Sequence, residues 1–203
     1  MSASAQRTKR RQLREETRQQ ILDVARELLR ERSFRDLSVD AVMSRTGHTR
    51  TVFYRHFDDI PSLVLTLIAE VGGELVAVSE AWAHTEESSP AQARKQLGHF
   101  VDFYVRNGVL VRAVAEAARH DAAVEAAYTQ MVENFVTLMT EAIEARVARG
   151  DLEPLDAPQI ARALVWMLNA YLNDTLGHEP VTDPERVLDA IVTIWTRTLY
   201  PAA

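Results

Sequence analysis

Apolar residues recur at helical spacing along almost the whole chain, and this pattern constrains the fold more than any other feature. No stretch keeps the strict alternation of polar and apolar residues that marks a half-buried strand. The 7 Gly and 7 Pro stand mostly where the periodicity stops, as expected of residues that interrupt helices. The sequence therefore predicts an all-α protein of about nine helices.

Capping signals set the expected boundaries of these helices. Ser38 can cap a helix that Gly47 ends, and three further starts, Ser89-Pro90, Asp156 with Pro158, and Asp183-Pro184, pair a capping side chain with a first-turn proline. The helices are expected at about 14–32, 39–46, 48–57, 60–84, 90–106, 109–118, 121–148, 158–176 and 184–199.

The composition excludes several classes of site. The chain has no Cys, which rules out disulfides, cysteine-ligated zinc and thiol nucleophiles. Its most apolar stretch, residues 64–71, is short and contains Glu70, and no apolar signal region follows the basic N-terminus. We therefore expect a cytoplasmic protein that does not enter a membrane.

Charge is divided unevenly between two parts of the chain. Residues 1–60 contain 13 Lys/Arg and 9 Asp/Glu, a net charge of +4, whereas residues 61–203 contain 10 and 20, a net charge of −10. A basic N-terminal domain (1–60, the head) on an acidic C-terminal domain (61–203, the body) suggests a polyanionic partner for the head. Random drift of surface charge is the alternative interpretation.

The segment 38–59, SVDAVMSRTGHTRTVFYRHFDD, has the pattern of a helix-turn-helix, with two short helices on either side of Gly47. At about 100° per residue, the second helix turns its apolar side chains toward its neighbours and its polar side chains outward. Outward arginine can bond both major-groove acceptors of guanine, and outward Thr and Tyr can contact thymine methyls or phosphates. An ordinary solvated helix is the alternative. The inward residues are Val52, Phe53 and Phe57; the outward ones are Arg50, Thr51, Tyr54 and Arg55.

These residues resemble the helix-turn-helix of the TetR family of bacterial transcriptional regulators, and residues 186–200, RVLDAIVTIWTRTLY, resemble its EthR-like branch. The resemblance implies a DNA-binding head and an effector-binding, dimerising body. It implies base contacts from Arg50, Thr51 and Tyr54. It also implies phosphate contacts from Ser38, Thr49 and His56.

The chain departs from the family pattern just after the motif. Family members commonly have Lys and then Glu where this chain has Ile60 and Pro61, so the usual phosphate-binding lysine is absent. Arg45, Arg55 and a basic N-terminal arm could supply phosphate contacts instead, the arm by entering a minor groove. A disordered solubilising tail would have the same composition as that arm. The arm contains Arg7, Lys9, Arg10 and Arg11.

The body contains most of the aromatic residues, some of them interleaved with amides along helix faces. Aromatic residues at helical spacing usually form core, but an apolar cavity with a few polar groups has the same composition. The resemblance implies that such a cavity binds a small, largely hydrophobic effector. The candidate lining residues are Phe100, Phe103, Tyr104, Asn107, Tyr128, Phe135, Trp166, Asn169, Asn173 and Trp195.

The helices at 158–176 and 184–199 have apolar residues around most of their circumference. Exposed on a monomer, they would form an apolar patch that needs a partner. We therefore expect a homodimer through these two helices. The dimer would place two recognition helices roughly one DNA turn apart on a pseudo-palindromic operator.

Gly72-Gly73 interrupts the helix that leaves the head. Two adjacent glycines soften a helix, by about 1 kcal/mol each relative to alanine, and could form a hinge that bends when the effector binds. Close packing of a neighbouring helix would equally favour glycine here.

The sequence thus predicts an effector-released transcriptional regulator, a repressor, without cofactor, metal site or catalytic residues. An all-α enzyme is one alternative, although the six His form no HExxH or paired ExxH pattern. A helical interaction module that does not bind DNA is the other.

Overall fold

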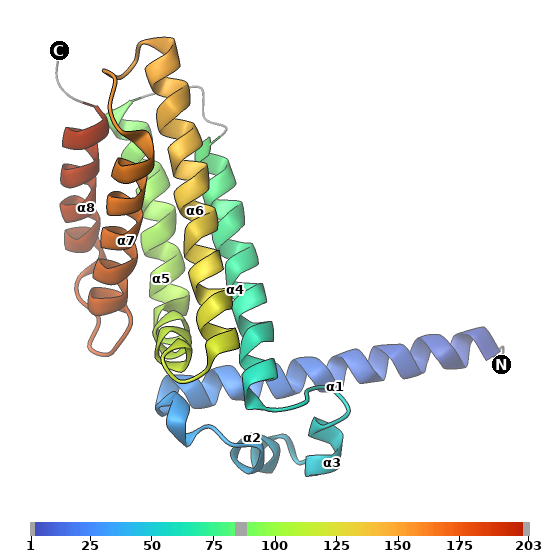
Figure 1. Cartoon of the computed structure of the whole chain (residues 1–203). Coiled ribbons are helices and arrows are strands. Elements are labelled where there is room, and N and C mark those ends of the chain that lie inside the picture. Colours follow the sequence, from blue (N-terminus) through green and yellow to red (C-terminus); the bar gives the residue numbers. More distant parts are fainter. Residues whose placement is uncertain (1–2, 84–88, 201–203) are drawn as a thin grey trace.

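The computed structural model describes residues 3–83 and 89–200, and every regular element in these ranges is a helix (Figure 1). The prediction of an all-α fold is confirmed. His84, the expected end of the fourth helix, lies outside the described residues. The elements are α1 (Ala3–Glu31), the short 3₁₀ helix η1 (Phe34–Asp36), α2 (Val39–Thr46), α3 (Arg50–Phe53), α4 (Ile60–Ala83), α5 (Pro90–Ala118), α6 (Ala122–Arg149), α7 (Ala157–Leu176) and α8 (Pro184–Leu199).

The helices form two groups that meet along α1 (Figure 1). Helices α4 to α8 stand side by side as a bundle, with α7 and α8 at one edge, and α1 runs across the foot of this bundle. Helices α2 and α3 lie on the other side of α1, away from the bundle. The long helix α1 therefore connects the small unit of α2 and α3 with the larger body.

The capping signals act as the sequence predicts. The side chains of Ser38, Ser89, Asp156 and Asp183 each accept a hydrogen bond from a backbone N–H in the first turn of their helix. Gly47 ends α2 at φ 71°, a left-handed conformation that costs glycine little. The entry and exit of the helix-turn-helix are thus fixed locally by the residues at its corners.

The body contains one helix where the sequence predicts two, so the expected break near residue 107 is wrong. Helix α5 runs without interruption through Gly108. A Cβ at that position would lie 2.4 Å from the carbonyl oxygen of Leu176. Gly108 is therefore explained by the close approach of the end of α7 and not by a turn.

The first helix starts much earlier than residue 14, so the prediction of its N-terminal boundary is also wrong. No Gly or Pro occurs between residues 3 and 31, and the segment consists largely of good helix formers. The basic residues of the expected arm, among them Arg10 and Arg11, therefore lie on α1 and are exposed to solvent. They extend as a helix beyond the rest of the head (Figure 1).

Helix α4 contains a segment, Ile60–Val78, that is long and apolar enough to cross a membrane by length and composition alone. In this fold the same segment packs against α5 and α6. Its polar residues Thr66 and Glu70 contact α1, and Glu74 contacts α5. About a third of the segment is buried inside the fold, so part of its apolar character serves the packing of the bundle.

Candidate functional site

The recognition segment, residues 48–57, has a buried face and an exposed face, as the helical spacing predicts. Phe53 is fully buried and Phe57 nearly so, and they pack against each other with their ring centroids 5.6 Å apart. On the other face Arg50 and Thr51 are exposed, and Tyr54 keeps 51% of its surface accessible. Regular α-helix ends at Phe53, but backbone bonds from Arg55 and His56 to Val52 and Phe53 continue the turn. The head thus presents a short polar ridge on a buried aromatic base.

Arg50 stands between two acceptors. Its Nη1 donates to Oδ2 of Asp40, on the first turn of α2, over 3.1 Å. Hydrogen bonding to Tyr54 and then the charge of Asp40 raise the pKa of the Arg50 guanidinium above its usual value. The guanidinium therefore stays charged and points toward α2.

Arg45, a predicted phosphate contact, is paired with a carboxylate of α1. Its two Nη atoms donate to the two oxygens of Glu31, over 2.9 and 2.5 Å. The guanidinium of Arg45 holds the pKa of Glu31 below its usual range. Both groups are partly exposed. Arg45 can therefore contact a phosphate only if it breaks or shares its two hydrogen bonds to Glu31.

The two predicted hydroxyl contacts differ in availability. Ser38 Oγ accepts from the backbone N–H of Ala41 and so caps α2, which leaves only its proton to donate. Thr49 precedes α3 in extended conformation, and its side chain makes no capping hydrogen bond. Thr49 therefore has the freer hydroxyl for a phosphate at the start of the recognition segment.

A basic groove of about 550 Å³ separates α1 from the recognition segment. None of the described residues along it is acidic, and Arg14, which the sequence interpretation missed, is part of its wall. Arg14 donates to the backbone carbonyl of Arg55 over 3.2 Å, and this bond joins the two sides. The groove is lined by Arg10, Leu13, Arg14, Thr17, His48, Val52, Arg55 and His56.

The missed residues carry a recognisable signal in the sequence. Arg14 and Arg18, which were missed, follow the predicted Arg10 at intervals of four, which places all three on one face of a continuous helix. Arg18 lies over the ring of Phe57 at 5.3 Å and donates to Thr66 of α4. The signal was hidden because α1 was expected to start at residue 14.

His56, the other predicted phosphate contact, is partly buried at the end of this groove. Burial is the main cause that lowers the pKa of its imidazole, and the charges of Arg14, Arg18 and Arg55 lower it further, whereas Glu15 opposes them. The imidazole of His56 is therefore mostly neutral near pH 7. A phosphate placed in the groove would favour its protonation.

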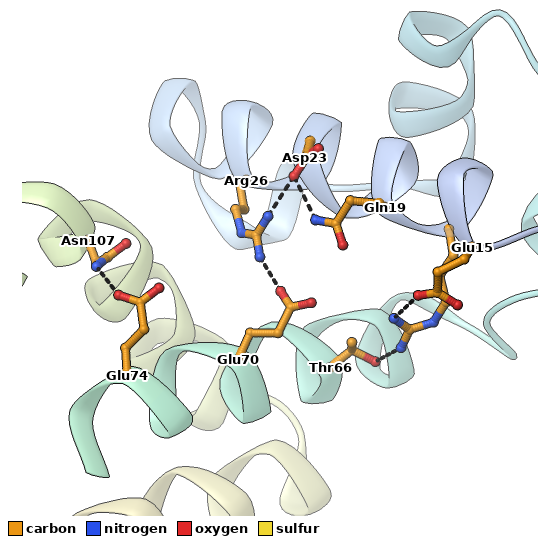
Figure 2. A network of polar contacts seen from close by, with 9 residues as sticks. Glu15, Gln19, Asp23, Arg26, Thr66, Glu70, Glu74 and Asn107 are labelled. Atoms are coloured by element: carbon orange, nitrogen blue, oxygen red, sulfur yellow. Dashed lines mark hydrogen bonds and ion pairs between the residues drawn. The ribbon is translucent and has the colours of Figure 1, made fainter. Parts of the chain in front are cut away.

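A chain of polar contacts ties the head to the body along α4 (Figure 2). Arg26 of α1 lies between Asp23 of its own helix and Glu70 of α4, and forms ion pairs with both. One turn further along α4, Glu74 accepts from Asn107 of α5 over 3.2 Å. Helix α4 is thus joined to α1 of the head through Glu70 and to α5 of the body through Glu74.

The body has an apolar cavity of about 330 Å³ between α4 and α6. Leu75 and Phe135 line this outer cavity and also a smaller inner one of about 20 Å³. Two amides, Gln130 and Asn134, supply polar groups to the outer lining. The outer cavity is lined by Leu65, Ile68, Ala69, Gly72, Leu75, Val76, Ala127, Gln130, Met131, Asn134, Phe135 and Leu138.

A polar cluster lies behind the inner cavity. Tyr128 donates to Oδ1 of Asn169 over 2.9 Å, and Asn169 Nδ2 donates to the hydroxyl of Tyr104 over 3.4 Å. Burial raises the pKa of both tyrosines, so both stay protonated. Asn173 Oδ1 is buried and has no hydrogen-bond partner among the described residues. This cluster contains four of the ten predicted pocket residues.

The other predicted pocket residues divide into two groups. Phe100 and Phe135 stack with their centroids 4.9 Å apart and line the inner cavity. Phe103, Asn107, Trp166 and Trp195 line neither of the two cavities. Trp195 is fully buried in the core, Asn107 bonds to Glu74, and Trp166 is half-buried near Glu133. Helical periodicity identified their apolar surroundings but could not distinguish core from cavity.

Gly72 and Gly73 lie within an unbroken α4. A Cβ on Gly73 would meet nothing within 4 Å, and one on Gly72 would make ordinary contact with Met131 at 3.6 Å. Close helix packing therefore does not require glycine at either position. The hinge hypothesis stays a prediction.

Among the residues that the structure describes, no three His, Asp or Glu side chains gather as metal ligands would. The conspicuous polar groups of the head are arginines and hydroxyls, and those of the body are amides and phenols. Such groups recognise anions and orient ligands by hydrogen bonds.

Comparisons with known proteins agree with this division. The model described as "Bacterial regulatory proteins, tetR family" matches residues 21–67, and "Transcriptional regulator EthR, C-terminal domain" matches residues 93–201, more than half of the chain. The HTH-type transcriptional regulator EthR of Mycobacterium tuberculosis is 27% identical over 186 residues, which cover 89% of this chain and 85% of the relative. Its namesake in Mycolicibacterium smegmatis is 23% identical, with 89% and 84% covered.

Solved structures share the fold. A tetR-family regulatory protein from Rhodococcus RHA1 superposes with a TM-score of 0.76 at 17% identity, covering 92% of this chain and 98% of that one. A TetR-family regulator from Syntrophomonas wolfei gives 0.74 at 15% identity, with 93% and 98% covered. The matched families and relatives are transcriptional regulators and not enzymes. The chain belongs to the TetR family of bacterial transcriptional regulators and has a C-terminal domain of the EthR type.

Proposed function

We propose that the protein is a cytoplasmic, homodimeric repressor that binds a pseudo-palindromic operator and is released by a small, largely hydrophobic effector. The observation that carries this proposal is the polar ridge of α3. Arg50, Thr51 and Tyr54 are exposed there, while Phe53 and Phe57 anchor the ridge from below. A ridge of this kind fits the major groove, where Arg50 can read guanine and the other two can contact thymine methyls.

The phosphate contacts come from both sides of the ridge. On one side we assign Thr49 and Ser38, with Arg45 joining them when its pairing with Glu31 is shared. On the other side the groove between α1 and α3 can take up one stretch of DNA backbone. Arg14, Arg55 and His56 would contact it, and Arg10 and Arg11 would extend the contact along α1. These cations replace the phosphate-binding lysine of the family pattern, in whose place this chain has Ile60.

The dimer would form through the outer face of α7 and α8. Ile194 keeps 45% of its surface exposed, and Trp166, Met167 and Tyr171 are only partly buried. Helices α7 and α8 stand at one edge of the bundle (Figure 1). Pairing this edge with its symmetry copy would bury the exposed apolar surface and form a four-helix bundle.

The effector site would join the two cavities of the body. An apolar molecule can enter between α4 and α6, and a rotation of Leu75 or Phe135 would open the way to the inner cluster. There the unpartnered Oδ1 of Asn173 can accept from a polar group of the effector, while Asn169 and Tyr104 orient it. The predicted chemistry is an elongated apolar ligand with one hydrogen-bonding end.

Selection of bound sequences from random duplex DNA tests the DNA-binding part. We expect a pseudo-palindrome whose affinity falls steeply as salt rises. Arg50→Ala should relax base preference at one position of each half-site, whereas Arg32→Ala removes the same charge from the head outside the motif and should not. If the protein enriches no sequence, the assignment of the head fails.

A screen of apolar compounds tests the effector part. Compounds that release the protein from the selected operator should also raise its melting temperature, because they bind the folded state. Asn169→Ala should reduce this stabilisation, and Asn107→Ala, which changes an amide that lines neither cavity, should leave it intact. If Asn107→Ala reduced the stabilisation and Asn169→Ala did not, the effector would bind outside the two cavities.

Sedimentation of the free protein tests the dimer. Ile194→Asp places a charge at the centre of the proposed interface and should yield monomers, whereas Val105→Asp changes another exposed apolar residue of the body and should not. A monomeric wild-type protein, or a dimer that both variants leave intact, would contradict the proposed interface.

A further inference from the structure

Asp40 is an unexpected residue on the surface proposed to face DNA. It lies in the first turn of α2, and 69% of its side chain is exposed. A carboxylate in this place repels the phosphates of an approaching duplex. Its presence beside Arg50 therefore calls for a function that offsets the repulsion.

Stability of the head does not supply that function. Ser38 already caps α2, and an ion pair between two exposed side chains contributes little to folding. A carboxylate in the first turn also complements the helix dipole, but only weakly at an exposed site. That effect would act equally on all DNA sequences.

The contact with Arg50 has the geometry of a support for a base-reading side chain. Asp40 accepts through Oδ2 from Nη1 of Arg50 over 3.1 Å. Arginine has five N–H donors, so this contact leaves enough for the N7 and O6 acceptors of a guanine. A guanidinium fixed in this way loses less rotamer freedom when it binds.

The second oxygen of Asp40 extends the recognition to a neighbouring base. No hydrogen bond to Oδ1 is found among the described residues. In the major groove cytosine presents an amino donor without an adjacent acceptor, and adenine presents its amino donor beside the N7 acceptor. Guanine and thymine present acceptors and no donor, and a carboxylate is repelled by acceptors. A carboxylate beside the guanine-reading arginine therefore favours cytosine at the adjacent position.

We propose that Asp40 is a specificity-determining residue, which positions Arg50 for guanine and itself accepts from the amino group of an adjacent cytosine. The proposal rests on the operator binding proposed above. It assigns sequence recognition to α2 as well as to α3. It also implies that Asp40 weakens binding to unrelated DNA while strengthening discrimination.

The test compares Asp40→Ala, Asp40→Asn, Arg50→Ala and the Asp40→Ala/Arg50→Ala double variant on the operator selected by the wild-type protein. Fluorescence anisotropy gives the affinity for that duplex, for duplexes with each single base-pair change, and for an unrelated duplex. Asp36→Ala is the matched control, because it removes an exposed carboxylate from the same head outside the motif. Circular dichroism melting confirms that each variant folds.

Asp40→Ala should bind the unrelated duplex several-fold more tightly and lose about tenfold in discrimination at the guanine and at the adjacent cytosine. Asp40→Asn keeps the shape and can also donate, so it should tolerate guanine or thymine at the cytosine position. Adding Asp40→Ala to Arg50→Ala should produce no further loss at the guanine. Asp36→Ala should change all affinities by a similar, small factor.

Three outcomes would overturn the inference. The first is an unchanged base preference at both positions in Asp40→Ala. The second is a change of all affinities by the same factor as in Asp36→Ala. The third is an effect of Asp40→Ala that persists undiminished at the guanine in the double variant. If these outcomes appear while Arg50→Ala still relaxes one position, the operator proposal stands and only the role of Asp40 fails. If the wild-type protein selects no sequence, the proposed function itself fails, and this inference with it.

Discussion

The head and the body use their interiors differently. In the head, closely packed residues such as Leu22, Val42 and Phe53 form one end of the continuous hydrophobic core, and the groove beside α3 is open to solvent. The body combines long helices with an apolar cavity and a buried polar cluster. A filled core holds exposed side chains in fixed positions, whereas a core with a cavity can adapt to a ligand. The comparison suggests that the head is a rigid reader of DNA and that the body is an adaptable sensor of the effector.

The largest expected effect comes from breaking the base of the reader. Phe53→Ala should lower the free energy of unfolding by about 3–5 kcal/mol, because it opens a cavity in a filled core. Phe135→Ala in the body should cost less, because its side chain already borders two cavities and has fewer contacts to lose. Denaturant unfolding of both variants measures the difference. Equal losses would contradict the contrast between the two interiors.

Arg14→Ala should weaken DNA binding by about 1.5 kcal/mol, the value of one charge-assisted contact. The loss should be nearly uniform across sequences and should reduce the salt slope by about one. Titrations at several salt concentrations measure both quantities. Arg112→Ala, an exposed arginine of the body, is the control, and a loss restricted to one base position would show that Arg14 is not a phosphate contact.

DNA binding should strengthen several-fold as the pH falls from 8 toward 6. Burial and nearby arginines lower the pKa of His56 in the free protein, and a bound phosphate would raise it. The protonated form is therefore favoured in the complex, so this contribution is full below the free pKa and is lost as the pH rises through the bound pKa. His56→Gln should flatten the profile, His99→Gln should not, and an unchanged profile in His56→Gln would exclude proton uptake at this site.

The smallest effect concerns the junction of the two regions. Gly73→Ala should stabilise the protein by roughly 0.5–1 kcal/mol, because the position is an exposed helix interior with free space for a methyl group. Thermal unfolding checks the stability. Together with Gly72→Ala it should also blunt release from DNA by the effector; full release by a stabilised double variant would rule out the hinge.

Local signals predicted much of the fold. Ser38, Gly47 and the three later caps fixed helix ends because each acts through hydrogen bonds within one turn. The faces of the recognition segment followed from the same helical geometry. Gly108 misled the prediction, because the carbonyl of Leu176 that demands it lies 68 residues away in the sequence.

The candidate site could be predicted only in part for the same reason. Arg50 and Tyr54 were found from their own helix, but Asp40 and Arg14 reach the site from other helices. Their contacts with Arg50 and with the Arg55 carbonyl depend on how these helices cross. In the body, Phe100 and Trp195 are both aromatic residues on apolar helix faces, so the sequence does not distinguish them. Phe100 lines a cavity, whereas Trp195 is part of the core.

The contacts along α4 also bear on where the head ends. Glu70 is tied to α1 and Glu74 to α5, and the two glycines lie between these attachments. If α4 bends at the glycines, its first three turns would move with the DNA-binding unit and its remaining turns with the sensor. We therefore expect the mechanical boundary at residues 72–73, twelve residues beyond the boundary that charge alone indicates. In that case a bend at the glycines would shift the head through the first three turns of α4, which would move with it as one rigid unit.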